Sequence, residues 1–172
     1  MLRNLLIITC MLCTVTTSFG QKKEEEKSEK KVNYKEIGAP MPPIRMVTQD
    51  GKVYTTKKLK NKYNLIVMLF NPTCEHCHEE TFTLEKNIHL IDKSHVLLMA
   101  SKDVASYMDF FKNTTKYPQY PSLKVGVDSA DFVNQTFRYQ SLPQINIYDK
   151  NRKLIRIFNG DTPIDSLKQY IQ

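Results

Sequence analysis

Several residue types that mark special classes of protein are scarce in this sequence. The chain has 5 Gly and 8 Pro in 172 residues, which excludes a collagen-like or low-complexity protein. Its 4 Cys are too few for a small fold held together by disulfide bonds. Hydrophobic residues nevertheless make up 41% of the chain, too large a fraction for a disordered protein. The length and composition therefore predict one soluble α/β or α+β domain with a further segment at its N-terminus.

The first part of the chain, residues 1–20, has the three parts of a secretory signal peptide. Arg3 supplies a basic start, an apolar run extends over Leu5–Val15, and small residues flank Phe19 just before an expected cleavage site at Gln21. The apolar run is about half as long as the roughly 20 residues of a membrane-spanning helix, which favours a cleaved signal over an uncleaved anchor. A lipoprotein signal needs a small residue before its modified cysteine, a requirement that the two cysteines of this segment do not meet well. The sequence thus predicts secretion and no membrane span after cleavage.

Residues 21–34 are predicted to form a charged, flexible linker. Within them, Gln21–Lys31 contains five Lys and four Glu and no apolar residue, so it has nothing to bury in a core. Most of the formal net charge of +7 then falls on the domain predicted over residues 35–172. That charge favours solubility, or contact with acidic partners or anionic headgroups. No motif typical of nucleic-acid binding is present, so no nucleic-acid partner is predicted.

The domain alternates between apolar segments typical of strands and patterns typical of helices. Leu65–Phe70 is a continuous apolar run, as expected of a strand buried on both faces. Val96–Ala100 is a second such run, and Leu123–Val127 is a weaker third. Ile145–Tyr148 and Leu154–Phe158 alternate apolar and polar residues on either side of a turn-forming stretch, which predicts a β-hairpin.

Apolar residues at helical spacing occur between these strands and after the last one. The predicted buried faces comprise Phe82, Ile88 and Ile91 on a helix that begins near Cys74, then Val104, Tyr107, Met108 and Phe111, then Phe132, Val133 and Phe137, and finally Leu167, Tyr170 and Ile171. The last helix is expected to have Thr162 as its cap and Pro163 at its first helical position. This order of elements predicts an α/β fold, a three-layer α/β/α sandwich whose central mixed sheet ends in a β-hairpin and a C-terminal helix.

Cys74 and Cys77 would be the only cysteines left after signal cleavage. A disulfide between them would close a loop of four residues and contribute little to stability, which favours chemistry over structure as their role. Cys74 follows the first buried strand and is expected at a helix N-terminus, where unpaired N–H groups and the helix dipole stabilise a nucleophilic thiolate. Cys77 lies one turn further along and is placed to resolve a mixed disulfide.

With this pair the chain resembles the thioredoxin superfamily, and within it the secreted bacterial thioredoxin-like (redoxin-like) proteins of thiol–disulfide exchange and cytochrome c maturation. The resemblance extends over residues 36–172. It rests on the Cys74-x-x-Cys77 motif, on Ser141-Leu142-Pro143 before the hairpin, and on Gly38-Ala39-Pro40 and Asp50-Gly51-Lys52 near the start of the domain. It implies a thioredoxin-like sandwich and a location in the bacterial periplasm.

The resemblance also implies roles for residues outside the motif. Pro143 is expected to follow a cis peptide bond, an arrangement found at about 5–6% of prolines, and to lie against the disulfide. The backbone of Leu142 is expected to pair with an extended substrate strand, and Thr73, where many members have Trp, is counted among the substrate-binding residues. Glu80 matches an acidic residue near the disulfide in the cytochrome-maturation branch and is assigned to the catalytic set. Met68 stands where thioredoxin has a buried acid, which leaves proton relay to another acid such as Glu80.

His76 lies between the two cysteines and is predicted to influence the direction of the redox reaction. Its imidazole can donate a hydrogen bond or positive charge to the Cys74 thiolate, which stabilises the reduced pair and raises its redox potential above that of thioredoxin. The negative charges of Glu75 and Glu79 act in the opposite direction. An ordinary exposed histidine at the start of a helix is the alternative interpretation.

The sequence therefore predicts a secreted thiol–disulfide oxidoreductase with the catalytic residues Cys74, Cys77, His76 and Glu80, no cofactor and no metal. Its expected partners are protein thiols or disulfides and a redox partner protein. Three alternatives remain open. The string that ends at His78 also fits the C-x-x-C-H pattern of haem attachment, and the two cysteines with His76 or His78 could bind zinc. The third alternative is a thioredoxin-like binding module without catalytic activity.

Overall fold

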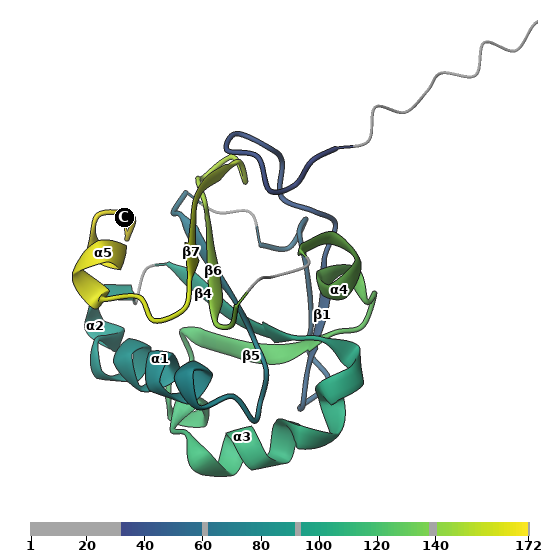
Figure 1. The fold of residues 1–172 in the computed structure, drawn as a ribbon, viewed down its shortest axis with the longest axis vertical. Helices are drawn as coiled ribbons and strands as arrows, with labels where there is room; N and C mark the ends of the chain where they lie inside the picture. The colour runs from purple at the N-terminus through teal and green to yellow at the C-terminus, as the bar shows by residue number, and fades with distance from the viewer. Residues whose placement is uncertain (1–31, 60–61, 92–93, 138–140, 172) are drawn as a thin grey trace, which may run out of the picture. The chain divides into compact units, whose positions relative to one another are not determined.

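Seven strands form one mixed sheet at the centre of the fold (Figure 1). The computed structural model describes residues 32–59, 62–91, 94–137 and 141–171, so the predicted signal peptide and most of the predicted linker lie outside the described residues. The strands are β1 (Arg45–Thr48), β2 (Val53–Thr55), β3 (Leu65–Phe70), β4 (His95–Ala100), β5 (Leu123–Asp128), β6 (Gln144–Tyr148) and β7 (Leu154–Asn159). Their order across the sheet is β2-β1-β5-β4-β3-β6-β7.

The central strands β3, β4 and β5 are parallel to one another, and their outer neighbours β1 and β6 are antiparallel to them. All six residues of β3 are buried, as expected for the predicted apolar run. The predicted hairpin of β6 and β7 is confirmed by their antiparallel pairing, which has a register shift between Ile147 and Tyr148. The sequence did not predict β1 and β2, because both are short and most of their residues are only half-buried.

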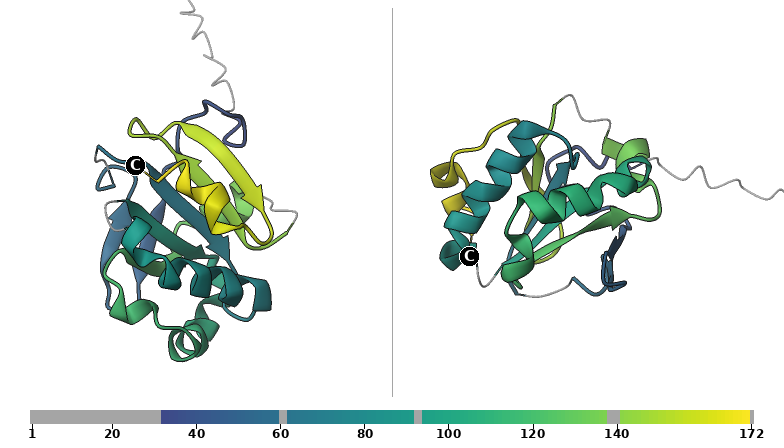
Figure 2. Two further views of the ribbon diagram at one scale, coloured as in Figure 1. Left: turned by 90° about the vertical axis from the view of Figure 1, so that its left-hand side faces the viewer. Right: turned by 90° about the horizontal axis from the view of Figure 1, so that it is seen from below.

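Helices cover both faces of the sheet (Figure 2). One face carries α1 (Glu75–Lys86), α2 (Ile88–Ile91), the 3-10 helix η1 (Lys102–Tyr107), α3 (Met108–Thr114), the 3-10 helix η2 (Tyr117–Gln119) and α5 (Ile164–Lys168), and the other face carries α4 (Phe132–Phe137). Leu84 of α1, Phe111 of α3 and Leu167 of α5 belong to one apolar core, whereas Phe137 of α4 belongs to the other. The predicted three-layer α/β/α sandwich is therefore confirmed. No helix in the described part of the chain is long and apolar enough to span a membrane.

The buried face of α1 differs from the predicted one. It consists of Cys77, Glu80, Thr81, Leu84 and Glu85. Phe82, which the apolar spacing placed inside, is 37% exposed. The helix ends at Lys86, and the backbone N–H of its C-cap Asn87 donates to the last turn. Ile88 and Ile91 therefore lie in the separate helix α2. The prediction was wrong because two carboxylates lie on the buried face, where a search for apolar residues does not find them.

Two further helices begin elsewhere than predicted. The segment from Val104 to Phe111 divides into η1 and α3, and Tyr107, expected on the buried face, is 52% exposed. In α5, Pro163 occupies the N-cap position rather than the first helical position. The Thr162 hydroxyl donates to a backbone carbonyl in the preceding turn instead of capping the helix. The backbone N–H of Thr162 donates to the side chain of Glu80 in α1.

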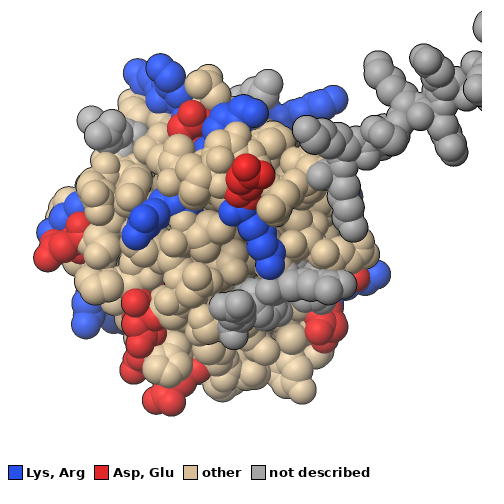
Figure 3. Space-filling model, turned by 45° about the horizontal axis from the view of Figure 1, so that its top comes forward, with Lys and Arg blue, Asp and Glu red and all other residues tan. Residues whose placement is uncertain are grey.

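Charged side chains are dispersed over the face of the molecule in Figure 3. Lys and Arg predominate over its upper part, with Asp and Glu among them and along the lower edge. On this face the positive charge is therefore spread out rather than gathered into one continuous patch. This distribution is consistent with a role of the net positive charge in solubility.

Gly126 of β5 lies where β5 and β1 approach closely. A Cβ atom at this position would lie 2.5 Å from the carbonyl oxygen of Val47 and 2.9 Å from its carbonyl carbon. Both atoms belong to the backbone of β1, so the two strands would have to separate. We therefore expect Gly126→Ala to lower the free energy of unfolding by about 1–3 kcal/mol, measured by urea denaturation. An unchanged unfolding midpoint would show that β1 moves aside at no cost and would contradict this expectation.

Candidate active site

The turn between β3 and α1 places Cys74 at the N-terminus of the helix. The Asn71 side chain accepts hydrogen bonds from the backbone N–H and the hydroxyl of the exposed Thr73, each at 3.0 Å. The Asn71 carbonyl accepts the backbone N–H of Cys74 at 3.1 Å. Cys74 is the half-buried N-cap residue of α1, and Cys77 is fully buried one turn later. The pair therefore lies at a helix N-terminus, as the sequence predicted.

The two cysteines lie 3.0 Å apart, and no disulfide bond joins them. Burial raises the pKa of the Cys77 thiol, and its hydrogen bond with Cys74 raises that pKa further. Cys77 is thereby held in the thiol form, while Cys74 is the more accessible of the two. This arrangement suits an attacking Cys74 and a Cys77 whose proton must be removed before it can react.

Glu80 lies on the buried face of α1, three residues after Cys77, and is only 3% exposed. Its Oε2 atom accepts the backbone N–H of Thr162 at 2.9 Å, whereas its Oε1 atom has no hydrogen-bond partner among the described residues. Burial raises the pKa of Glu80 to about 7, although the bond from Thr162 opposes this change and the nearby charge of Asp161 adds to it. Glu80 lines an open cavity of about 320 Å³ together with Asp161 and Thr162. A carboxyl group with this pKa can accept and return a proton near neutral pH.

The peptide bond between Leu142 and Pro143 is cis, as the resemblance to the thioredoxin superfamily implied. Pro143 is buried, and its carbonyl accepts the backbone N–H of Gly160 at 2.8 Å. Leu142 is half-buried and, like Cys74, packs against the apolar core that contains Cys77. The structure thus brings Leu142 and the cysteine pair to the same core. The roles of Leu142 and Pro143 in substrate binding stay predictions.

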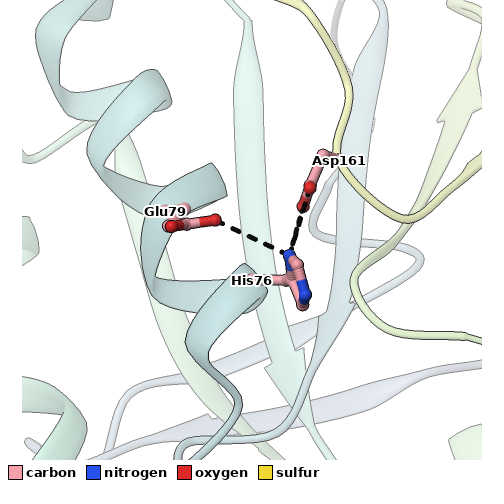
Figure 4. A group of neighbouring side chains, drawn as sticks. All are labelled: His76, Glu79 and Asp161. Atoms are coloured by element: carbon pink, nitrogen blue, oxygen red, sulfur yellow. Dashed lines mark hydrogen bonds and ion pairs between the residues drawn. The ribbon is translucent and has the colours of Figure 1, made fainter.

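His76 has its Nδ1 atom directed at two carboxylates (Figure 4). Nδ1 lies 3.1 Å from both carboxylate oxygens of Asp161, which precedes α5, and 3.6 Å from Oε2 of Glu79 on α1. The effect of His76 on Cys74 stays a prediction. Sequence reasoning missed Asp161 because it lies 85 residues from His76 and belongs to no motif. The sequence around Asp161 predicted only the start of the last helix.

No protein-family model matches the sequence, and no curated protein matches it either. Solved structures do match. A thioredoxin-like protein from Bacteroides caccae matches with a TM-score of 0.63 and 16% identity, over 78% of this chain and 48% of that one. The thioredoxin domain of a thiol-disulfide oxidoreductase from Bacteroides vulgatus matches with a TM-score of 0.62 and 15% identity, over 80% of this chain and 99% of that one. This chain has a thioredoxin-like fold.

A third structure with a thioredoxin-like fold is the exposed lipoprotein thioredoxin Etrx1 of Streptococcus pneumoniae. It matches with a TM-score of 0.58 and 22% identity, over 76% of this chain and 98% of that one. This chain spans about half the length of the Bacteroides caccae protein. Identities of 15–22% show the thioredoxin-like fold alone, so the activity has to be argued from the residues of this chain.

In this thioredoxin-like fold, His78 joins the cysteine turn to α3. Its Nε2 atom donates a hydrogen bond to the carbonyl of Pro72 at 2.7 Å, and its Nδ1 atom lies 3.3 Å from the hydroxyl oxygen of Thr114. The centre of its ring lies 4.9 Å from that of Phe111 and 5.7 Å from that of Phe110. Both ring nitrogens therefore have partners in the protein. This disfavours haem or zinc ligation by His78, since a ligating histidine needs a free ring nitrogen.

A cation could be held by a different group of side chains. Nδ1 of His76 and the carboxylates of Glu79 and Asp161 offer ligand atoms that all lie within 4.8 Å of one another. All three side chains are exposed, and the ion pairs among them account for the arrangement without a metal. Cys74 and Cys77 belong to no such group of ligands within the described ranges.

Proposed function

We propose that this protein is a secreted thiol–disulfide oxidoreductase that exchanges disulfides with protein substrates through Cys74 and Cys77. The observation that supports this proposal most is the geometry of the pair. The half-buried Cys74 at the N-cap of α1 lies 3.0 Å from the fully buried Cys77. Cysteines this close can form and open a disulfide with little movement. Cys74 is also the more accessible of the two, so a substrate sulfur can reach it first.

The exchange takes place in two steps. In the reducing direction, the Cys74 thiolate attacks one sulfur of a substrate disulfide, a mixed disulfide forms, and the other substrate sulfur leaves as a thiolate. Cys77 then loses its proton and attacks the sulfur of Cys74, which releases the second substrate thiolate and leaves a Cys74–Cys77 disulfide. Two electrons pass from the cysteine pair to the substrate. The oxidising direction follows the same steps in reverse.

Glu80 is the proposed acceptor of the Cys77 proton. The two residues share the buried face of α1 at i, i+3 spacing, which makes them neighbours on the helix. Because burial raises the pKa of Cys77, the thiol keeps its proton unless a base is close. The Glu80 carboxyl has a pKa of about 7, and its Oε1 atom has no hydrogen-bond partner in the described part of the chain. It can therefore accept the proton from Cys77 and return it to solvent through the adjoining cavity.

Thr73, Leu142 and Pro143 are the proposed substrate-binding residues. Thr73 is exposed directly before Cys74, and Leu142 packs against the same core as Cys74. An extended substrate segment beside Leu142 would bring a disulfide to Cys74. The proposed location is the bacterial periplasm, where a second redox protein would return the pair to its starting state. One structure of similar fold, from Streptococcus pneumoniae, is an exposed lipoprotein thioredoxin.

Equilibration with glutathione tests the proposed function. The chain from Gln21 onward would be incubated at a series of glutathione ratios, and its free thiols would be alkylated and counted by mass. We expect Cys74 and Cys77 to change together, at a redox potential above the value of about −270 mV for thioredoxin. A value near about −120 to −200 mV would indicate a disulfide donor, and about −250 mV or lower a reductant. If the pair does not equilibrate, the proposal fails and a non-catalytic binding module becomes the better explanation.

A further inference from the structure

Three consecutive residues between β7 and α5 each contact a different part of the redox site. The backbone N–H of Gly160 donates to the carbonyl of the cis proline, and that of Thr162 donates to the buried Glu80. Asp161, between them, directs both carboxylate oxygens at the ring of His76. Because backbone hydrogen bonds hold the residues on either side, Asp161 has a defined position beside the cysteine motif.

The Nδ1 atom of the His76 ring faces the carboxylates of both Asp161 and Glu79 (Figure 4). The side chains of His76, Asp161 and Glu79 are 62%, 61% and 60% exposed. Ion pairs this exposed contribute little to the stability of a fold. The contacts of His76 with the two carboxylates therefore matter for the position of the imidazole and for its interaction with the cysteines, rather than for the stability of the fold.

We infer that Asp161 is a positioning residue that holds the His76 imidazole at the β7–α5 connection and thereby lowers the redox potential of the Cys74–Cys77 pair. The inference rests on the proposed oxidoreductase function. An imidazole that donates a hydrogen bond or positive charge to Cys74 stabilises the thiolate and so raises the potential. The Asp161 carboxylate at Nδ1 engages that nitrogen, which is then not free to donate to Cys74. The reduced pair is then less stable than it would be beside a His76 without this contact.

The charge of Asp161 also reaches the inner part of the site. Burial has the largest effect on the pKa values of Cys77 and Glu80, and the charge of Asp161 raises both values further. Cys77 stays in the thiol form with or without this charge, so the field of Asp161 at Cys77 does not by itself change the balance between the reduced pair and the disulfide. Removal of the Asp161 carboxylate is therefore expected to favour the reduced pair through His76.

The test compares Asp161→Asn with the wild-type full-length protein, in buffer with EDTA to remove metal ions. The ratio of reduced to oxidised pair at a fixed glutathione ratio is read on the peptide that contains both cysteines. Asp161→Asn is expected to raise this ratio about tenfold, which corresponds to about 30 mV for a two-electron couple. The control is Asp165→Asn, which removes an exposed carboxylate paired with Lys168 in α5 and should leave the ratio within about twofold of wild type.

A double-mutant cycle separates positioning of His76 from the direct field of Asp161. In the His76→Ala background, Asp161→Asn is expected to change the ratio by less than about threefold, because this background has no imidazole whose contact with Asp161 could be lost. An equal change with and without His76 would overturn the inference, and so would an unchanged ratio in Asp161→Asn. A wild-type pair that does not equilibrate with glutathione would instead overturn the proposed function, and this inference with it.

Discussion

Replacement of Cys74 by Ser is expected to reduce disulfide exchange to background. Cys74 is the more accessible cysteine and the N-cap residue of α1, so a substrate disulfide can reach its sulfur. A serine hydroxyl at the same place does not ionise near neutral pH and cannot form a disulfide. The measurement is the rate at which the reduced protein opens a peptide disulfide. Exchange that survives this substitution would contradict the assignment of Cys74 as the attacking residue.

Cys77→Ser is the matched variant, because it removes the second sulfur and leaves the first in place. Attack by Cys74 still forms a mixed disulfide, but no thiol is left in the motif to resolve it. Mixed disulfides with substrate proteins are therefore expected to accumulate and to be visible on non-reducing gels. The variant that lacks both sulfurs should trap nothing. If Cys77→Ser also traps nothing, the resolving role of Cys77 is wrong.

The second large effect is expected for Glu80→Gln, since an amide cannot accept the Cys77 proton. General acid–base groups contribute about 10²–10⁴-fold, so the exchange rate is expected to fall at least about 10²-fold. In the wild type the rate should rise with pH through about 7, where Glu80 ionises, and the variant should lose this step. The control is Glu85→Gln. Burial also raises the pKa of Glu85 on the same face of α1, but its carboxylate accepts the backbone N–H of Lys116 at 2.8 Å, so its loss should not alter the profile.

The same variant should also change how stability depends on pH. The pKa of Glu80 is about 7 in the folded protein against an ordinary value of 4.5, so the folded state binds the proton more tightly than the unfolded state. This contribution to stability is complete below pH 4.5 and is lost as the pH rises through about 7, by up to about 3 kcal/mol. A glutamine oxygen can still accept the N–H of Thr162, so Glu80→Gln should be the more stable protein above pH 7. Urea denaturation at acidic and at alkaline pH measures the difference, and a wild-type pH dependence in the variant would contradict it.

The parts of the fold that the sequence predicted are those whose pattern is local. β3 is a continuous apolar run because helices cover it on both faces. β6 and β7 form the predicted hairpin, although all five residues of β6 are buried, the polar Asn146 included. β1 pairs with β5, far along the chain, and is too short for a pattern of its own. In α1, burial of Glu80 and Glu85 depends on partners supplied by other segments, Thr162 and Lys116. The spacing of apolar residues within the helix does not predict those partners.

The residues of the candidate site likewise comprise some that a local pattern predicts and others that it does not. Cys74 and Cys77 could be identified from their spacing, because the motif and the helix N-terminus lie in one short stretch of chain. Glu80 came from the resemblance to thioredoxin-like proteins, and the structure supplies the physical reason for its raised pKa, which is burial. Asp161 could not be predicted. Its contact with His76 depends on the path of the chain from β7 into α5, which no residue near the cysteines specifies.

The connection between β7 and α5 makes the site sensitive to loop length. The contacts of Gly160 and Thr162 come from the backbone, whereas Asp161 acts through its side chain. Gly160 has a φ of +75°, which other residues rarely adopt, so a substitution of this glycine would strain the connection. Insertion or deletion of one residue would displace all three contacts together. In proteins of this fold, a change of loop length at this connection would therefore mark a different arrangement around the cysteines, while a substitution at the position of Asp161 would alter one contact only.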